Sequence, residues 1–292
     1  MTLKDFFLTV YKTKRLRGKS PETTRLYLIS INHFSRTMGR EATLDDLTDD
    51  NLNLHCQRVK DLGKAAATIN KDISQITTIW RFAHRQNIVS RWPDVMKETE
   101  PERVPQAWMP DELKALVDSI STSDEVVGNI PAKLYWLAFV YLCIDTGERV
   151  SAIRSVQWSW LSSDWLSVPA EARKGKTRDR AYKLNPDTLA ILAQIKPYTS
   201  GKHVIPWPYC KQYFWKKYAK VLDAAGLPTG RRCGPHRLRR THASAVHAAG
   251  GNAQAAMDHA DARTTKGYID PRLSTEVSAS SILANYMGRK KE

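Results

Sequence analysis

A polar stretch about a third of the way along the chain most constrains how it can fold. Residues 97–107, Lys-Glu-Thr-Glu-Pro-Glu-Arg-Val-Pro-Gln-Ala, are mostly polar and contain two prolines. That composition is typical of an extended linker. A chain of 292 residues is long enough for two domains that each bury a core of their own. We therefore predict an N-terminal domain over 1–96, a linker over 97–107 and a larger domain over 108–292.

The N-terminal domain has the pattern of a small helical bundle. Ser20 and Pro21 give one helix a capping hydroxyl and a proline in its first turn. Apolar residues then recur at helical spacing, as at Leu28, Ile31 and Phe34. The predicted helices cover residues 2–12, 20–38, 48–63 and 65–86, with a basic loop from Lys12 to Lys19 after the first.

The C-terminal domain combines helical patterns with a few short strands. Strands are predicted over 165–168 and 181–184, on either side of a basic hairpin loop, with 203–205 as a third candidate. Helices are predicted from residue 110 and over 131–145, 186–196, 209–225, 236–249, 252–258 and 274–287. The predicted fold class is mainly α (α+β), with a helical first domain and a mostly helical second domain that contains a small antiparallel β-sheet.

Both halves of the chain are basic. Lys and Arg number 45 against 30 Asp and Glu, which gives a net charge of +15 and a pI near 9.7. The excess is present in residues 1–100 and again in residues 101–292. Such a balance favours a polyanionic partner, although it does not constrain the fold. Charge alone is compatible with DNA, with RNA or the ribosome, and with an anionic membrane.

The cysteines and the apolar segments indicate an intracellular protein. Cys56, Cys143, Cys210 and Cys233 are far apart and form no CxxC pair, which favours reduced thiols over a disulfide framework or a zinc site. The N-terminus lacks the apolar core of a signal peptide. The longest apolar run, 134–144, is too short to span a bilayer and predicts a buried helix. We expect a cytoplasmic protein that does not bind a membrane.

Two separate stretches carry cations suited to a phosphate. Thr146-Gly147-Glu148-Arg149 follows the predicted buried helix, and an arginine there can present its planar guanidinium to a phosphate. Taken alone, such an arginine is more often a solvated residue or an ion-pair partner. The basic loop contains Lys174 and Lys176, and either lysine can protonate a leaving oxygen or simply contact a DNA backbone. The loop is not a nucleotide-binding P-loop, because Ala170 stands where the motif needs a glycine.

The last sixty residues hold two histidines, an arginine and a tyrosine. His236 and Arg239 are three residues apart on a predicted helix and so share a face, and His259 precedes Tyr268 by nine residues. No acidic residue occurs between residues 231 and 257, so the five arginines of that stretch predict a basic surface. The chain there has no HExxH motif and no nearby carboxylate, which argues against a metal site. The set is suited to binding a phosphate and attacking it with a phenol.

In this order, the stretches resemble those of the tyrosine recombinases, the phage integrase family. That family has a TG-x-R box, a lysine in a hairpin, an H-x-x-R box and a histidine nine residues before a tyrosine. The matching positions are Arg149, Lys174 or Lys176, His236, Arg239, His259 and Tyr268. The resemblance extends over the whole chain, because the family also places a helical core-binding domain before its catalytic domain. Residues 1–96 and 108–292 would take these two roles.

The chain departs from the family pattern at positions beside these six. Ala152 stands where many members have glutamate, Arg237 where aspartate is frequent, and Asp258 where a glycine precedes the histidine. These departures concern the orientation of the site, since none is a chemical position. The lysine has two candidates. Residues 169–171 favour Lys174, whereas Lys176 followed by threonine matches another common form.

The resemblance implies a site-specific DNA recombinase or integrase that needs no metal, ATP or other cofactor. Tyr268 would attack the scissile phosphate to give a 3′-phosphotyrosyl link and a free 5′-hydroxyl. Arg149 and Arg239 would hold the non-bridging oxygens, and His259 would donate a hydrogen bond to the same phosphate. His236 would accept the tyrosine proton, and Lys174 or Lys176 would protonate the departing oxygen.

The resemblance also implies partners and a location. These are double-stranded DNA with specific recombination sites, a homo-tetramer that forms on DNA from monomers, accessory DNA-bending proteins, and the nucleoid. The segment 274–287 would dock on a neighbouring protomer or pack on its own domain. Two other interpretations stay open: a DNA-binding protein on the same scaffold with a weakened site, and a topoisomerase that relaxes DNA. A phage, a transposon, an integron and a chromosome-dimer resolution system remain alternatives for the source.

Overall fold

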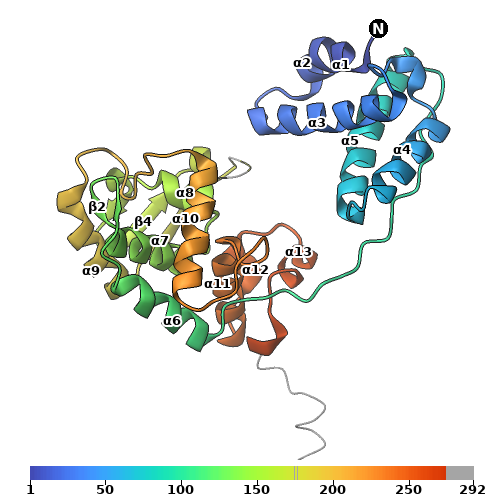
Figure 1. Ribbon diagram of the computed structural model, residues 1–292. Coiled ribbons are helices and arrows are strands. Elements are labelled where there is room, and N and C mark those ends of the chain that lie inside the picture. The colour runs from blue at the N-terminus through green and yellow to red at the C-terminus, as the bar shows by residue number, and fades with distance from the viewer. Residues whose placement is uncertain (174, 176, 274–292) are drawn as a thin grey trace, which may run out of the picture. The chain divides into compact units, whose positions relative to one another are not determined.

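The computed structural model describes residues 1–173, 175 and 177–273. It divides into two compact units, Met1–Glu102 and Arg103–Glu292 (Figure 1). Each unit buries apolar clusters of its own. Residues 86–109, which connect the last helix of the first unit to the first helix of the second, contain no helix or strand.

The first unit is a bundle of helices. It contains α1 (Leu3–Phe6), the π-helical turn η1 (Phe7–Tyr11), α2 (Lys12–Arg15), α3 (Pro21–Met38), the 3₁₀ turn η2 (Leu44–Asp46), α4 (Asp49–Asp61) and α5 (Ala66–Arg85). Helices α3, α4 and α5 pack against one another. The side chains of Phe7, Phe34 and Trp80 are fully buried between them. As predicted, Pro21 opens α3, but the prediction of a capping hydroxyl on Ser20 was wrong, because that hydroxyl lies 3.2 Å from the Thr23 hydroxyl and not on a backbone amide. At the start of α4 the Thr48 hydroxyl accepts from the Asn51 amide.

The prediction of a loop from Lys12 to Lys19 was wrong at its start. The chain stays helical to Arg15, and only residues 16–20 connect it to α3. Lysine and arginine are good helix formers, and the side chains of 12–15 are exposed, so nothing interrupts the helix before Gly18. The wider turn of η1 lets Phe7 and Tyr11 bury their rings together with the α1 residues.

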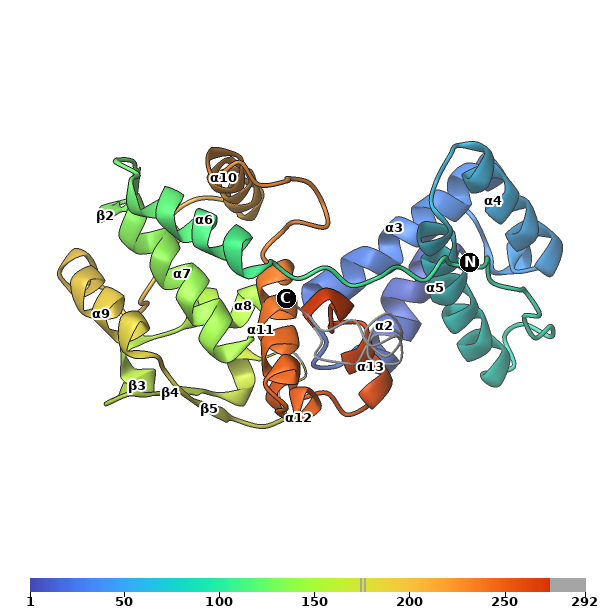
Figure 2. The same cartoon turned by 90° about the horizontal axis from the view of Figure 1, so that it is seen from below.

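The second unit is built around one helix that is buried along its length. This is α7 (Ala132–Thr146), and it confirms the helix predicted from the apolar run. It packs against α6 (Pro110–Ser121), α9 (Pro186–Ile195) and α11 (His236–Ala248) (Figure 2). The remaining helices and turns are α8 (Val150–Ser155), η3 (Trp158–Trp160), η4 (Ala170–Ala172), η5 (Lys196–Tyr198), α10 (Lys211–Ala224), α12 (Ala253–Met257), α13 (Ala262–Lys266) and η6 (Pro271–Leu273).

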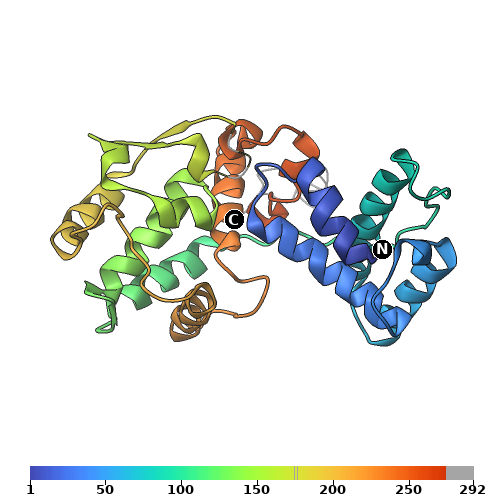
Figure 3. The same cartoon turned by 90° about the horizontal axis from the view of Figure 1, so that it is seen from above.

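Two small antiparallel sheets complete the second unit. One pairs β1 (Val126–Val127) with β2 (Ile130–Pro131), and the other has the order β3 (Leu161–Ser162), β4 (Trp165–Val168), β5 (Arg180–Lys183). Trp165 pairs with Lys183 and Val168 with Arg180. The three-stranded sheet and α10 lie on opposite sides of α7 (Figures 2 and 3). The predicted fold class, mainly α with a small antiparallel sheet, is confirmed.

The third strand was assigned to the wrong segment. The strand beside β4 is β3, whereas His203 makes only an isolated bridge to Gln157. Val204 and Ile205 are fully buried, so their apolar character reflects packing into the core rather than pairing in a sheet. The helix predicted over 274–287 lies outside the described residues.

All four cysteines are free thiols; three are buried, and Cys210 is exposed. Within the residues that the structure describes, no helix combines the length and the apolar character needed to cross a membrane.

Candidate active site

Helix α11 carries two of the predicted site residues on one face. His236 is its first residue, and its ring is accessible to solvent. Arg239 lies one turn later, and only 3% of its surface is exposed. A cation this deeply buried must be held by acceptors, because an unpaired buried charge is strongly unfavourable.

The Arg239 guanidinium joins three stretches that are far apart in sequence. Its Nη1 donates to the Gly147 carbonyl, and its Nη2 donates to the Met257 carbonyl at 3.0 Å. The same Nη2 lies 3.3 Å from His259 Nε2. Among the described residues, nothing accepts a hydrogen bond from its buried Nε. Three of its five N–H donors are thus occupied, and the guanidinium is fixed in place.

The turn after α7 needs a glycine for two reasons. Gly147 ends α7 in the left-handed conformation, with φ of +60°. A Cβ built at this position would lie 2.4 Å from Cδ2 of His242, whose ring packs against the turn. The close approach places the Gly147 carbonyl on Arg239 and brings Arg149 to the start of α8.

Tyr268 follows α13 and lies among the other site residues. The centroid of its ring is 5.1 Å from that of His236 and 4.9 Å from that of His259. Cζ of Arg239 lies 5.6 Å from the same centroid. The Tyr268 carbonyl accepts a hydrogen bond from Oγ of Ser244 on α11 at 3.2 Å. The backbone of the tyrosine is thus tied to the helix that carries His236 and Arg239.

His259 is held by both ring nitrogens. Nδ1 lies 3.0 Å from the Thr265 hydroxyl on α13, and Nε2 faces Arg239. A guanidinium only donates, so Nε2 accepts and a neutral ring carries its proton on Nδ1, which donates to Thr265. The preceding residue, Asp258, takes the left-handed conformation with φ of +55° where α12 ends. Aspartate tolerates this conformation better than most residues, and it stands where the family pattern has glycine.

The site is electrostatically positive. Desolvation, and then the charges of Arg240 and Arg239, lower the pKa of His236. Desolvation followed by the charges of Arg239 and Arg149 also lowers the pKa of His259. Both imidazoles are therefore neutral at pH 7 in the free protein. A bound phosphate would reverse the effect, because an anion favours the protonated form of a neighbouring histidine.

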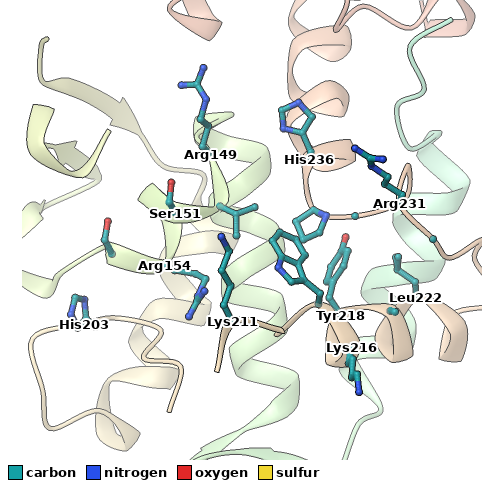
Figure 4. A pocket seen from close by; sticks show the side chains of 17 residues that line it. Arg149, Ser151, Arg154, His203, Lys211, Lys216, Tyr218, Leu222, Arg231 and His236 are labelled. Carbon is teal, nitrogen blue, oxygen red and sulfur yellow. The ribbon is translucent and has the colours of Figure 1, made fainter. Parts of the chain in front are cut away.

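Arg149 and His236 also line a cavity of about 1060 Å³ between α8, α10 and α11 (Figure 4). The side chains of Arg154, Lys211 and Arg231 extend the cationic lining. Among the described residues that line the cavity, none is acidic. Its charge suits a polyanion larger than one phosphate.

The structure brings most of the predicted site residues together. His236, Arg239, His259 and Tyr268 are neighbours, and Arg149 is close enough to change the pKa of both histidines. Lys174 and Lys176 lie outside the described residues. Sequence reasoning did not identify the supporting residues Glu148, Arg173, Thr265 and Ser244, and only Glu148, inside the TG-x-R box, had a signal that could have drawn attention to it.

The predicted basic surface was wrong for Arg237 and Arg239, which are both buried. Arg237 donates to the Ala107 carbonyl, pairs with Glu112 and stacks 3.6 Å from the centroid of the Trp108 ring. In the part of the chain that the structure describes, no group of three or more His, Cys, Asp or Glu side chains is arranged to hold a metal ion.

Comparison with known proteins gives relatives along the whole chain. Tyrosine recombinase XerD of Oceanobacillus iheyensis is 25% identical over 280 residues, covering 86% of this chain and 88% of the relative. Tyrosine recombinase XerC of Lactobacillus delbrueckii subsp. bulgaricus is 22% identical over 314 residues, covering 98% of each chain.

Solved structures share the fold. A lambda integrase (75–356) dimer bound to a COC′ core site matches with a TM-score of 0.71 at 20% identity, covering 95% of this chain and 98% of that one. The Tn1549 transposon integrase, in complex with a circular intermediate DNA, matches with a TM-score of 0.72 at 14% identity and 99% coverage of both chains. The model of the phage integrase family matches residues 108–274, which include all six predicted chemical positions. The chain belongs to the phage integrase family and is a tyrosine recombinase.

Proposed function

We propose that this recombinase cleaves and rejoins DNA through a covalent 3′-phosphotyrosyl link on Tyr268. The observation that carries the proposal is the placement of the Tyr268 ring beside His236, His259 and the Arg239 guanidinium. A phenol surrounded by these groups has cations for the phosphate and a neutral imidazole for its proton. In the reaction, Tyr268 Oη bonds to phosphorus, and the bond from phosphorus to the 5′-oxygen breaks.

Each residue has a role that follows from its surroundings. Arg239 is held by backbone carbonyls, so its positive charge is fixed in the site and stabilises charge on the phosphate without reorganising. Arg149, which lines the cavity, provides a second guanidinium. His236, neutral and accessible, accepts the tyrosine proton. Lys174 or Lys176, from the basic loop, gives a proton to the departing 5′-oxygen.

Phosphate binding changes the state of His259. In the free protein its Nε2 accepts from Arg239. A phosphate competes for the Arg239 donor and raises the pKa of the imidazole, because its negative charge favours the protonated ring. His259 then carries a proton on Nε2 and donates a hydrogen bond from this N–H to the phosphate. We expect DNA binding to be accompanied by proton uptake at slightly acidic pH.

The DNA partner and its assembly follow from the relatives. Lambda integrase has been seen as a dimer on a core site and as a tetramer on a Holliday junction. We propose that this chain likewise forms a tetramer on two duplex sites and that it is monomeric without DNA. Residues 1–96 would be the core-binding domain and 108–292 the catalytic domain. Accessory DNA-bending proteins remain part of this proposal. Light scattering with and without a synapsed DNA substrate tests the assembly.

Trapping the covalent intermediate tests the chemistry. Incubation with a pool of nicked duplexes of randomised sequence, followed by sequencing of the DNA that stays attached in detergent, identifies the site. A nicked duplex with that sequence then traps the adduct. The short fragment that carries the free 5′-hydroxyl diffuses away, so rejoining is prevented. We expect Tyr268→Phe to form no adduct. Tyr198→Phe, which changes a tyrosine that is 47% exposed and outside the site, should react like the unmutated protein.

Two outcomes would overturn the proposal. An adduct that persists in Tyr268→Phe would place the nucleophile elsewhere. DNA binding without any adduct from the unmutated protein would favour the DNA-binding interpretation with an inactive site.

A further inference from the structure

Glu148 is a carboxylate buried beside the catalytic residues, and none of the proposed chemical steps uses it. Only 2% of its surface is exposed. Its Oε1 accepts from Nε of Arg173 and, at 2.7 Å, from the hydroxyl of Tyr182 on β5. Its Oε2 accepts from the backbone amide of Arg149 at 3.2 Å. Glu148 thus fixes the backbone of a proposed phosphate-binding arginine to the start of the basic loop.

Arg173 begins the basic loop and also contacts its other end. The residue is 7% exposed. Its Nη1 donates to the carbonyl of Arg178 at 3.1 Å, across the residues that separate them. Its Nη2 reaches Oδ2 of Asp258 at 3.0 Å. One guanidinium therefore touches the TG-x-R box, the far end of the basic loop and the residue before His259.

The carboxylate of Asp258 lies close to three arginines in or beside the loop. Besides Arg173, its carboxylate pairs with Arg178 and lies 3.8 Å from Nη1 of Arg180. Arg180 also donates to the carbonyls of Ala255 and Ala256 on α12, at 2.9 and 3.3 Å. The strained backbone of Asp258 is thus accompanied by contacts that only a carboxylate provides, and these hold β5 and the loop end beside His259.

A buried network of ion pairs such as this one is weak evidence that its residues stabilise the fold. Removing two charges from water often costs as much as their attraction returns, and apolar replacements are frequently as stable. The effect of this network is geometric, because it joins the TG-x-R box, the ends of the basic loop and the residue before His259. An acid that protonates a leaving oxygen must stay within hydrogen-bond reach, and a displacement of about 1 Å can slow a reaction about 100-fold.

We propose that Glu148, Arg173 and Asp258 form a positioning network for the leaving-group step, which holds the two ends of the basic loop, at Arg173 and Arg178, beside Arg149 and His259. The inference rests on the proposed function, in which a lysine of that loop protonates the 5′-oxygen. In this role, none of the three residues contacts DNA or takes part in the proton transfer itself. The network acts through the placement of the loop. Loss of Arg173 therefore affects one proton transfer, whereas the bond from the Arg149 amide to Glu148, which supports phosphate binding, remains.

A change of leaving group separates this role from general structural damage. In one suicide substrate the scissile phosphate has its normal 5′-oxygen, and in the other that bridging oxygen is replaced by sulfur. With oxygen, the proton from the loop acid must reach the 5′-atom as the bond to phosphorus breaks. With sulfur, a thiolate leaves without a proton, because thiols ionise near pH 8.5 whereas water ionises only near 15.7.

We expect Arg173→Met to cleave the oxygen substrate about 100-fold more slowly and the sulfur substrate at nearly the unmutated rate. Glu148→Gln, which keeps the side-chain shape, should show the same selectivity and decides the matter if Arg173→Met does not fold. Arg263→Met is the matched control, because Arg263 is exposed and its ion pair among the described residues is with nearby Asp261; both of its rates should stay unchanged.

Equal losses on the two substrates in both variants would overturn the inference and assign the network a structural role. The proposed function fails separately. If the unmutated protein forms no adduct with either substrate, or if Tyr268→Phe still forms one, the covalent mechanism itself is wrong.

Discussion

The two units share three structural features, namely a buried carboxylate, a left-handed glycine at the end of a helix, and a histidine hydrogen-bonded to a threonine. The features serve different purposes in the two units. Each has a carboxylate that is almost fully buried, Asp72 in the first and Glu148 in the second. Each ends a helix with a left-handed glycine, Gly39 after α3 and Gly147 after α7. Each also holds a buried histidine through a threonine hydroxyl. These pairs are Thr37 with His55, at 2.8 Å, and Thr265 with His259, at 3.0 Å.

The partners of the two carboxylates show the difference. Asp72 on α5 accepts from Ser30 and His33 on α3 and lies 3.5 Å from His55 on α4, so it fastens three helices. Glu148 contacts an arginine, a tyrosine and a backbone amide in segments around the catalytic residues. The first network stabilises a bundle, whereas the second orients a site. Matched changes in the two units should therefore separate stability from catalysis.

The largest effect is expected for Asp72→Ala. It removes the carboxylate that the buried Ser30 and His55 and the half-buried His33 contact, and breaking a buried pair of this kind costs about 3–5 kcal/mol. Urea denaturation of the full chain should show this loss, and hydrogen exchange should place it in α3 to α5. The exposed Glu41→Ala is the control. A cost below about 1 kcal/mol would mean that the bundle does not depend on this network.

The next effect comes from the two glycines. A Cβ at Gly39 meets nothing within 4 Å, so Gly39→Ala should cost only the left-handed backbone, about 1 kcal/mol. Gly147→Ala adds a clash with His242, for a total of about 3 kcal/mol. It should also slow adduct formation at least about 10-fold, because the Gly147 carbonyl holds Arg239. Equal costs at the two positions would contradict the close approach at His242.

The pH dependence of stability gives a smaller effect. Burial alone would raise the pKa of Asp72, but hydrogen bonds from His55, Ser30 and His33 outweigh it and lower the pKa to about 2. Since the folded pKa is below the unfolded value, the stabilisation is complete above about pH 4 and is lost as the pH falls toward 2. The stability difference between the unmutated protein and Asp72→Asn should shrink by roughly 2 kcal/mol over this window. A constant difference would assign the low pH sensitivity to other carboxylates.

Local signals in the sequence predicted most of the helices in the described part of the chain and indicated the six candidate chemical positions. Pro21, Thr48 and the apolar run of α7 act within a few residues of the structure that they determine, so their patterns are visible in the chain. The spacing of His236, Arg239, His259 and Tyr268 is equally local, and the structure brings these residues together. Their catalytic roles remain a prediction.

Features that depend on distant partners were not predictable. Arg173 looked like one more cation of a basic loop, but its acceptors are 25 positions before it, at Glu148, and 85 positions after it, at Asp258. Strand β3 has only two residues, too few for a period-2 pattern, so the buried pair Val204 and Ile205 attracted the assignment instead. Asp258 was visible as a departure from the family pattern, although the reason for it lies in the arginines that surround it.

The smallest effects are expected from the two threonine–histidine pairs, and they make the sharpest comparison. Thr37→Val and Thr265→Val each remove one hydrogen bond to a histidine Nδ1, a change of about 1 kcal/mol. In the first unit the loss should appear as lower stability with an unchanged cleavage rate, because His55 only fastens helices. In the second it should appear as an approximately 5-fold slower adduct formation with little change in stability, because His259 loses its orientation toward the phosphate. The neighbouring, exposed Thr264→Val should change neither quantity. If Thr265→Val lowered stability and left cleavage unchanged, the hydroxyl would serve the packing of α13. The contrast between stability in the first unit and catalysis in the second would then not apply to their histidines.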